Sequence, residues 1–129
     1  MLRHKKMNLS SNVNFFLGLQ AQMKINHWQT KGFARHNAFG GFYDAVDPLI
    51  DRFVESAMGK YGRFVLDDET KNIELSNLSD IDLKGLINTL RDALNQFSEQ
   101  LDSKDTDLIN LRDEILSETN KLSYLLTLE

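Results

Sequence analysis

Apolar positions recur at helical spacing in four segments of the chain, which predicts four amphipathic helices. In the first segment these positions run from Val13 to Trp28. Residues 10–12, with the sequence Ser-Ser-Asn, precede the segment as candidate N-caps, and Gly32 is the expected C-terminal stop.

The second helix is expected to start near Ala34 and to bury a broad apolar face between Phe39 and Ala57. Pro48 falls inside this segment. Because proline removes a backbone hydrogen bond, we expect it to interrupt the helix with a kink near residues 44–47. Glycines 59 and 62 are expected to end the helix or loosen its last turn.

Residues 62–77 lack a helical pattern and are expected to form a long connection. A third helix, capped by Ser79 or Asp80, follows with apolar residues in steps of three and four: Leu83, Leu86, Leu90, Leu94, Phe97 and Leu101. After a polar turn, a fourth helix carries Leu108, Leu111, Ile115, Leu122 and Leu125 or Leu126. The pattern predicts an all-α, antiparallel four-helix bundle with a longer connection between helices two and three, as one domain over residues 1–129.

The composition excludes several kinds of metal site and several classes of function. The absence of cysteine excludes disulfides, iron–sulfur clusters and thiolate zinc sites, so a metal would need His, Asp, Glu or backbone oxygen as ligands. The net charge of −4 argues against nucleic-acid binding over the whole surface. The apolar run at residues 15–19 is too short for a signal-peptide core or a membrane span, and we expect a soluble, cytoplasmic protein.

Residues 25–56 hold two of the three histidines and a ladder of acids. On a helix, Asp47, Asp51 and Glu55 form one stripe, and His36 lies on the same side. Histidine and carboxylate are ligands for iron, manganese and zinc. However, His36 and Asp51 are about 22 Å apart along a helix that rises about 1.5 Å per residue, so they cannot share an ion within one chain. Two copies packed antiparallel about a two-fold axis would bring the histidine end of one chain to the acid end of the other.

Ordinary structural roles account for the same residues. A single histidine on an apolar helix face, such as His27, is commonly a core residue bonded to a neighbour. Acids that step by four commonly form the solvated face of a helix, and His36, just after a turn, can serve in capping or packing. Periodicity alone therefore leaves a helical bundle without assigned chemistry.

The same stretch resembles a known family. His27-Trp28 followed by Lys31-Gly32 is similar to the HWxxKG signature that ends the first helix of Dps-type mini-ferritins. The spacing His36-x-x-Phe39-x-x-x-Tyr43 and then Asp51-x-x-x-Glu55 resembles the second-helix motif of that family, after a turn about three residues shorter. The resemblance is strongest over residues 13–57, and the run Lys121-Leu122-x-Tyr124-Leu125-Leu126 continues it loosely.

The resemblance implies a ferritin-like bundle whose ferroxidase centre lies at a two-fold interface. His27 and His36 of one subunit and Asp51 and Glu55 of its partner would bind ferrous iron, with Trp28 packed beside the centre. Such proteins oxidise iron with peroxide or oxygen and store ferric mineral inside a shell of twelve subunits.

Two residues depart from the family pattern. Gly40 stands where the family has a further acid one turn after the second histidine, which weakens iron binding and disfavours a second bridged iron. Asp44 and Asp47 are candidate replacements. Pro48 is the second departure, since a kink would shift Asp51. The alternative is therefore a structural or interaction protein that keeps the bundle without oxidase chemistry.

DNA binding is the family's other common activity. Residues 1–9 form a short basic arm with Arg3, Lys5 and Lys6, and an oligomer would multiply such arms into a phosphate-binding surface. An ordinary charged terminus explains the same residues.

Overall fold

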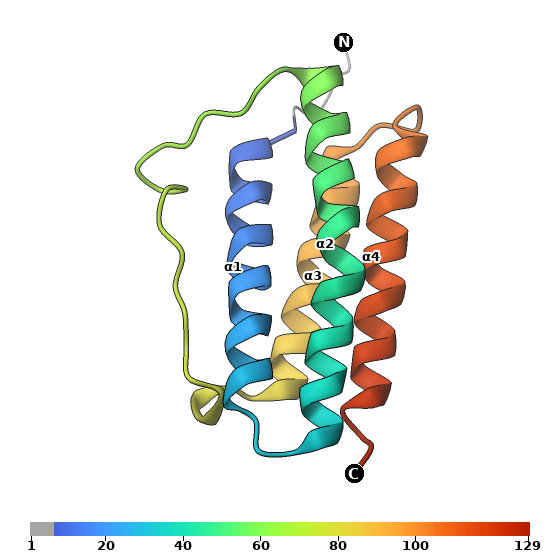
Figure 1. The fold of residues 1–129 in the computed structure, drawn as a ribbon. Coiled ribbons are helices and arrows are strands. Elements are labelled where there is room, and N and C mark those ends of the chain that lie inside the picture. Colours follow the sequence, from blue (N-terminus) through green and yellow to red (C-terminus); the bar gives the residue numbers. More distant parts are fainter. Residues whose placement is uncertain (1–6) are drawn as a thin grey trace.

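A computed structural model of the chain shows four helices packed as an all-α bundle (Figure 1). The structure describes residues 7–129, and this part of the chain contains no strand. The helices are α1 (Leu9–Gln29), α2 (Phe33–Tyr61), α3 (Leu83–Gln100) and α4 (Thr106–Leu125), with a short 3-10 helix, η1 (Leu78–Asp80), before α3. The predicted fold class is confirmed. No helix within residues 7–129 is long and apolar enough to cross a membrane.

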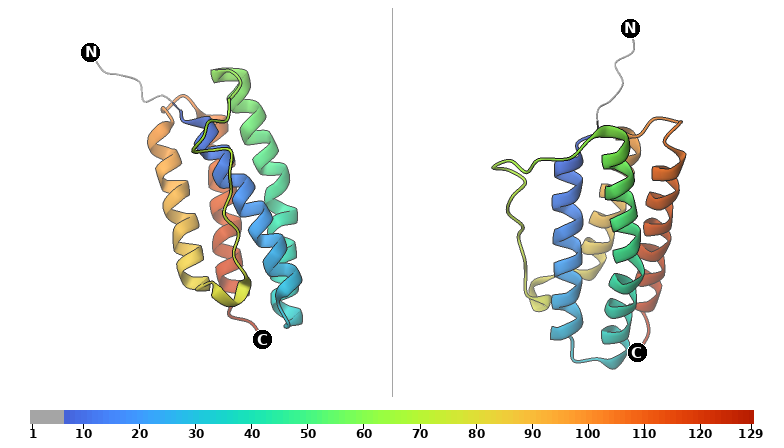
Figure 2. Two further views of the ribbon diagram at one scale, coloured as in Figure 1. Left: turned by 90° about the vertical axis from the view of Figure 1, so that its left-hand side faces the viewer. Right: turned by 45° about the horizontal axis from the view of Figure 1, so that its top comes forward.

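The helices α1 and α4 run in one direction, and α2 and α3 run in the opposite direction (Figures 1 and 2). The packed pairs α1–α2, α2–α4 and α3–α4 are therefore antiparallel. Because α2 and α3 are parallel, residues 62–77 must return along the whole bundle to connect them. A single long crossover of this kind is the topology of ferritin-like bundles.

The crossover is extended and is held against α1 by side-chain amides. The Asn14 side chain donates to the carbonyls of Thr70 and Asn72, at 2.8 and 2.6 Å. The Gln22 amide pairs with both backbone groups of Ser76, donating to its carbonyl at 2.9 Å and accepting from its N–H at 2.8 Å. These bonds satisfy backbone groups that have no sheet or helix partner.

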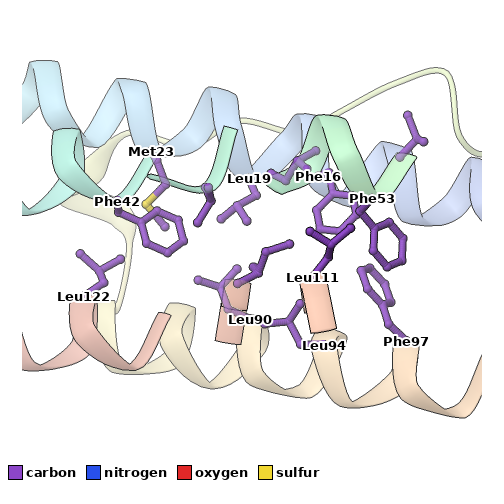
Figure 3. Packing of buried hydrophobic residues seen from close by; sticks show 14 of the residues in the cluster. Phe16, Leu19, Met23, Phe42, Phe53, Leu90, Leu94, Phe97, Leu111 and Leu122 are labelled. Atoms are coloured by element: carbon purple, nitrogen blue, oxygen red, sulfur yellow. The ribbon is translucent and has the colours of Figure 1, made fainter. Parts of the chain in front are cut away.

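The core runs along the axis of the bundle and contains residues from all four helices (Figure 3). At one end the Phe97 ring lies 5.2 Å from the Phe16 ring, edge to face, and 6.2 Å from the Phe53 ring. Most of the apolar positions expected to face inward do so, including Met23, Val46, Leu94, Leu108 and Ile115, whereas Trp28 at the end of the first pattern is exposed. Apolar burial of this kind is the main stabilising term of the fold.

The helix ends differ from the sequence-based expectation. The N-cap of α1 is Asn8, whose side chain accepts from the Ser11 N–H at 3.2 Å, so residues 10–12 lie inside the helix. At the other end α1 stops at Gln29, and Gly32 is the N-cap of α2 instead of the stop of α1. A cap is chosen by which side chain reaches the free N–H groups, and several neighbouring polar residues satisfy the sequence rule equally well.

The start of α3 is also corrected. Asp82 is its N-cap and accepts from the Gly85 N–H at 3.2 Å, whereas Ser79 and Asp80 form η1. Met7 and Leu9, which the predicted basic arm included, are buried in the core. Arg3, Lys5 and Lys6 lie outside the described residues.

Pro48 does not interrupt α2, which continues as a helix from Phe33 to Tyr61. The proline and Asp44, whose carbonyl would have bonded the missing N–H, are both exposed. Water can solvate that carbonyl, so the helix tolerates the loss of one bond.

Candidate metal centre at the first turn

The tight turn between α1 and α2 brings the two candidate histidines together. His27 lies in the last turn of α1 and His36 in the first turns of α2. Their rings are stacked, with centroids 3.7 Å apart and planes inclined by 20°. Both side chains are half-buried. The sequence-based expectation that these residues flank a turn is confirmed, and their direct contact is new.

Each ring is fixed by the backbone of the other residue. Nδ1 of His27 lies 2.6 Å from the carbonyl oxygen of His36, and Nδ1 of His36 lies 2.8 Å from the carbonyl oxygen of His27. A carbonyl only accepts, so each Nδ1 must carry the proton and donate it. In the neutral rings Nε2 then keeps its lone pair and is available to a metal ion.

One of these two bonds also closes a helix end. The carbonyl of His27 belongs to the last turn of α1, where carbonyl groups have no partner in the helix. The His36 ring supplies the missing donor from α2. We call this reciprocal arrangement of His27 and His36 the histidine clasp.

Gly40 and Tyr43 border the clasp on α2. A Cβ atom built on Gly40 would lie 2.8 Å from Cε1 and 2.9 Å from Nδ1 of His27, so the ring occupies the space of a side chain at position 40. The Tyr43 ring meets the His27 ring edge to face at 5.4 Å. Lys24 of α1 lies over the Tyr43 ring, with its Nζ 5.6 Å from the ring centroid.

The acids lie on the same helix but not beside the clasp. Asp51 and Glu55 are exposed further along α2, and Asp44 is exposed as well. Asp47 is half-buried and accepts a hydrogen bond from Nε2 of Gln20 at 3.0 Å. Within residues 7–129 no three His, Asp or Glu side chains of one chain gather into a metal-binding group. The shared two-chain site thus stays a prediction.

Large aromatic side chains beside the clasp are uncovered. Trp28 is 70% exposed and Phe33 is 79% exposed, one on each side of the turn. In a single chain Trp28 therefore does not pack against the histidines. An exposed aromatic pair is typical of a surface that a partner covers.

A second polar cluster was not found from the sequence. Asp105, at the start of α4, is fully buried and accepts hydrogen bonds from Lys60, from the Tyr61 hydroxyl at 2.6 Å and from the Asp102 N–H at 3.0 Å. Its partners on α2 are more than forty residues away in the chain, and only its position at a helix start hinted at a role.

Burial, hydrogen bonds and charge together shift the pKa values of this cluster. Burial raises the pKa of the Asp105 carboxyl, but the bonds from Lys60, Tyr61 and the Asp102 amide outweigh burial together, and the pKa lies below its usual value. The bond to Asp105 raises the pKa of Lys60. Burial and the bond to Asp105 raise the pKa of Tyr61 to about 12.

The fold and the clasp define a four-helix bundle with one long crossover and a histidine pair at its first turn. The chain belongs to the family of unknown function DUF5856, whose model matches residues 27–126. It is also 37% identical, over 57 residues, to the uncharacterized 14.6 kDa protein in the mobD-ri intergenic region of Enterobacteria phage T4. That match covers 41% of this chain and 44% of the relative, so the chain spans less than half of the relative's length. No solved structure matches the chain significantly.

Proposed function

We propose that the protein is a Dps-like mini-ferritin that binds ferrous iron between two subunits and oxidises it. The observation that carries the proposal is the histidine clasp, which directs the Nδ1 hydrogens of His27 and His36 into backbone carbonyls and leaves both Nε2 atoms without a hydrogen bond to any of residues 7–129. Backbone carbonyls that accept from the second ring nitrogen are the usual support of metal-binding histidines.

The proposed centre is completed by a second copy of the chain. Asp51 and Glu55 are exposed one turn apart on α2, where they can hold an ion supplied with histidine from outside their own chain. The antiparallel approach of two α2 helices about a two-fold axis would generate two equivalent centres. Trp28 and Phe33, exposed beside the clasp, would be covered in this dimer.

Geometry and charge favour one ion per centre. A ligating imidazole holds its ion near the ring plane, about 2 Å from the nitrogen. Two stacked rings inclined by only 20° do not direct their Nε2 atoms to one common point, so in the proposed centre the His27 ring takes the ion and His36 holds that ring in place. Two carboxylates balance one divalent cation, and position 40 supplies no third.

The reaction is a one-electron oxidation of each ferrous ion. One hydrogen peroxide accepts two electrons, from two ferrous ions, and takes up two protons to give two water molecules. The protein supplies the ligand geometry and the negative charge that stabilises the ferric product. A cytoplasmic location and a twelve-subunit shell belong to the same proposal.

The test measures iron binding calorimetrically without oxygen, then follows ferric absorbance after peroxide is added. His27→Ala, His36→Ala and Asp51→Ala should lower both signals, whereas Asp92→Ala, an exposed acid on α3, should change neither. Wild-type traces from the three site variants would reject the centre.

Subunit mixing tests whether the centre is shared. A mixed dimer of His27→Ala and Asp51→Ala chains holds one intact centre and one that lacks both ligands. Reassembly of the two inactive variants should restore about a quarter of the wild-type centres, because about half of the dimers are mixed. No recovery, or a wild-type protein that stays monomeric, would contradict the two-fold arrangement.

A second function is favoured by the clasp itself. The His36 ring satisfies the end of α1 and the His27 ring ties α1 to α2, so the pair has a structural role without any metal. In this reading the protein keeps the bundle as an interaction module and has no oxidase chemistry. Metal-free wild type with no iron affinity, together with a lowered unfolding temperature for His27→Ala, would favour it.

A further inference from the structure

We infer that Gly40 is a positioning residue for His27, and that a carboxylate at position 40 would disrupt the centre instead of completing it. The structural part of the inference concerns the metal-free clasp. Its consequence for metal affinity rests on the proposed function.

Position 40 has no room for a Cβ atom while the His27 ring keeps its place. Gly40 is buried on α2, one turn after His36, and the His27 ring from α1 lies against its Cα. A Cβ atom there would lie 2.8 Å from Cε1, 2.9 Å from Nδ1 and 3.7 Å from Nε2 of His27. The first two distances are shorter than real side-chain contacts allow, so the ring has to move.

Movement of the ring breaks the clasp. The Nδ1 atom that a Cβ would crowd is the atom that donates to the His36 carbonyl at 2.6 Å. If His27 turns about its Cα–Cβ bond to avoid position 40, it loses this bond, the stack on His36 and the edge contact with Tyr43. The bundle itself can remain folded, because the side chain that yields is half-buried and lies at the end of α1.

A side chain at position 40 and the histidine clasp are therefore alternatives. The space that a further acid would need is filled by the imidazole that the centre uses. Where the mini-ferritin family has an acid, this chain instead has a half-site made of two imidazoles held by backbone carbonyls. Adding the acid would add a charge but displace a ligand.

Gly41 provides a matched control. It follows Gly40 in the same helix, is exposed, and a Cβ built on it meets nothing within 4 Å. Alanine at either position gains the same helix propensity, and aspartate at either position adds the same charge. Each Gly40 variant is therefore compared with the Gly41 variant that carries the same new residue. A difference within such a pair reports the contact with His27.

The first measurement is nitrogen NMR of the imidazoles in the metal-free protein at pH 8, which distinguishes Nδ1–H from Nε2–H tautomers. Wild type and both Gly41 variants should show His27 with its proton on Nδ1. Both Gly40 variants should lose that signature. A Gly40→Ala protein that keeps it would overturn the inference, whatever the protein binds.

The second measurement is calorimetric titration with cobalt(II) as a stable probe for ferrous iron. Loss of the carbonyl that supports a ligating histidine typically weakens metal binding about tenfold to a hundredfold. We expect a loss of this size for Gly40→Asp and none for Gly41→Asp. Tighter binding, or a second ion, in Gly40→Asp would overturn the inference. Absence of cobalt binding in wild type would instead reject the proposed function and leave the NMR result standing.

Discussion

Replacement of Asp105 tests whether the buried polar cluster at the start of α4 stabilises the bundle. The carboxylate is fully buried and accepts from Lys60, Tyr61 and the Asp102 N–H, yet it makes no capping bond to α4 itself. Its effect on stability should therefore come from contacts with α2 and with the preceding turn. Asp105→Ala removes all three bonds.

The size of the expected loss in unfolding free energy depends on how exposed the donors are. Lys60 is 41% exposed at its side chain and Tyr61 is 45% exposed, so both can turn to water once the acceptor is gone. The ion pair with Lys60 adds little, because the half-exposed Lys60 ammonium stays hydrated whether or not the buried carboxylate is present. Tyr61 and the Asp102 amide both donate to a charged acceptor. Their loss, reduced because the donors can reach water, should lower the free energy of unfolding by about 2–3 kcal/mol. For a chain of this length that loss lowers the unfolding temperature by about 10 °C.

The assay is urea unfolding at pH 7, followed by circular dichroism, with Asp92→Ala as an exposed acid control. Asp105→Ala should shift the midpoint with little change in slope, and the control should stay within about 0.5 kcal/mol of wild type. Asp105→Asn should lie between them, because it keeps the shape and loses the charge. Wild-type stability of Asp105→Ala would refute the assignment of the cluster as a stabilising contact.

The pH dependence supplies a second check on the same residue. The folded pKa of Asp105 lies below that of a free aspartate, so the unfolded chain takes up the proton first as pH falls. The stabilisation is thus complete above the unfolded pKa and is lost as pH falls through the lower folded pKa. The advantage of wild type over Asp105→Asn should be constant at neutral pH and shrink below about pH 4. If the stability difference between wild type and Asp105→Asn grew as pH fell, the folded pKa of Asp105 could not be lowered.

Two further predictions concern other contacts. The phenolate absorbance of wild type minus that of Tyr61→Phe should titrate near pH 12, because the folded pKa of Tyr61 is raised to about 12. The contribution of Tyr61 to stability should be lost as pH rises from 10 towards that value. A titration midpoint at pH 10 would contradict this prediction. Gln22→Ala should speed amide hydrogen exchange at Ser76, because it removes the bonds that hold this part of the crossover to α1. Gln20→Ala should leave Ser76 unchanged, because the Gln20 side chain bonds Asp47 of α2 instead; equal protection of Ser76 in both variants would show that the crossover is held elsewhere.

Much of the site could be located from the sequence, but its local geometry could not. The spacing placed His27 and His36 on opposite sides of a turn, and they do meet there. Nothing in the spacing indicated that each ring would bond the backbone of the other, because that depends on the angle at which α1 and α2 pack. Gly40 was interpreted only as a missing ligand, and its contact with His27 emerged from the packed helices.

The sequence by itself determined the number, order and apolar faces of the helices, because helix formation and burial depend on residues three and four positions apart. It also determined that one long crossover must separate two helical hairpins. Only the tertiary structure decided the contacts between distant segments, such as Asp105 with Tyr61 and Gln22 with Ser76. Such contacts depend on how whole helices are placed against one another, and many pairs of polar residues are compatible with the same periodicity.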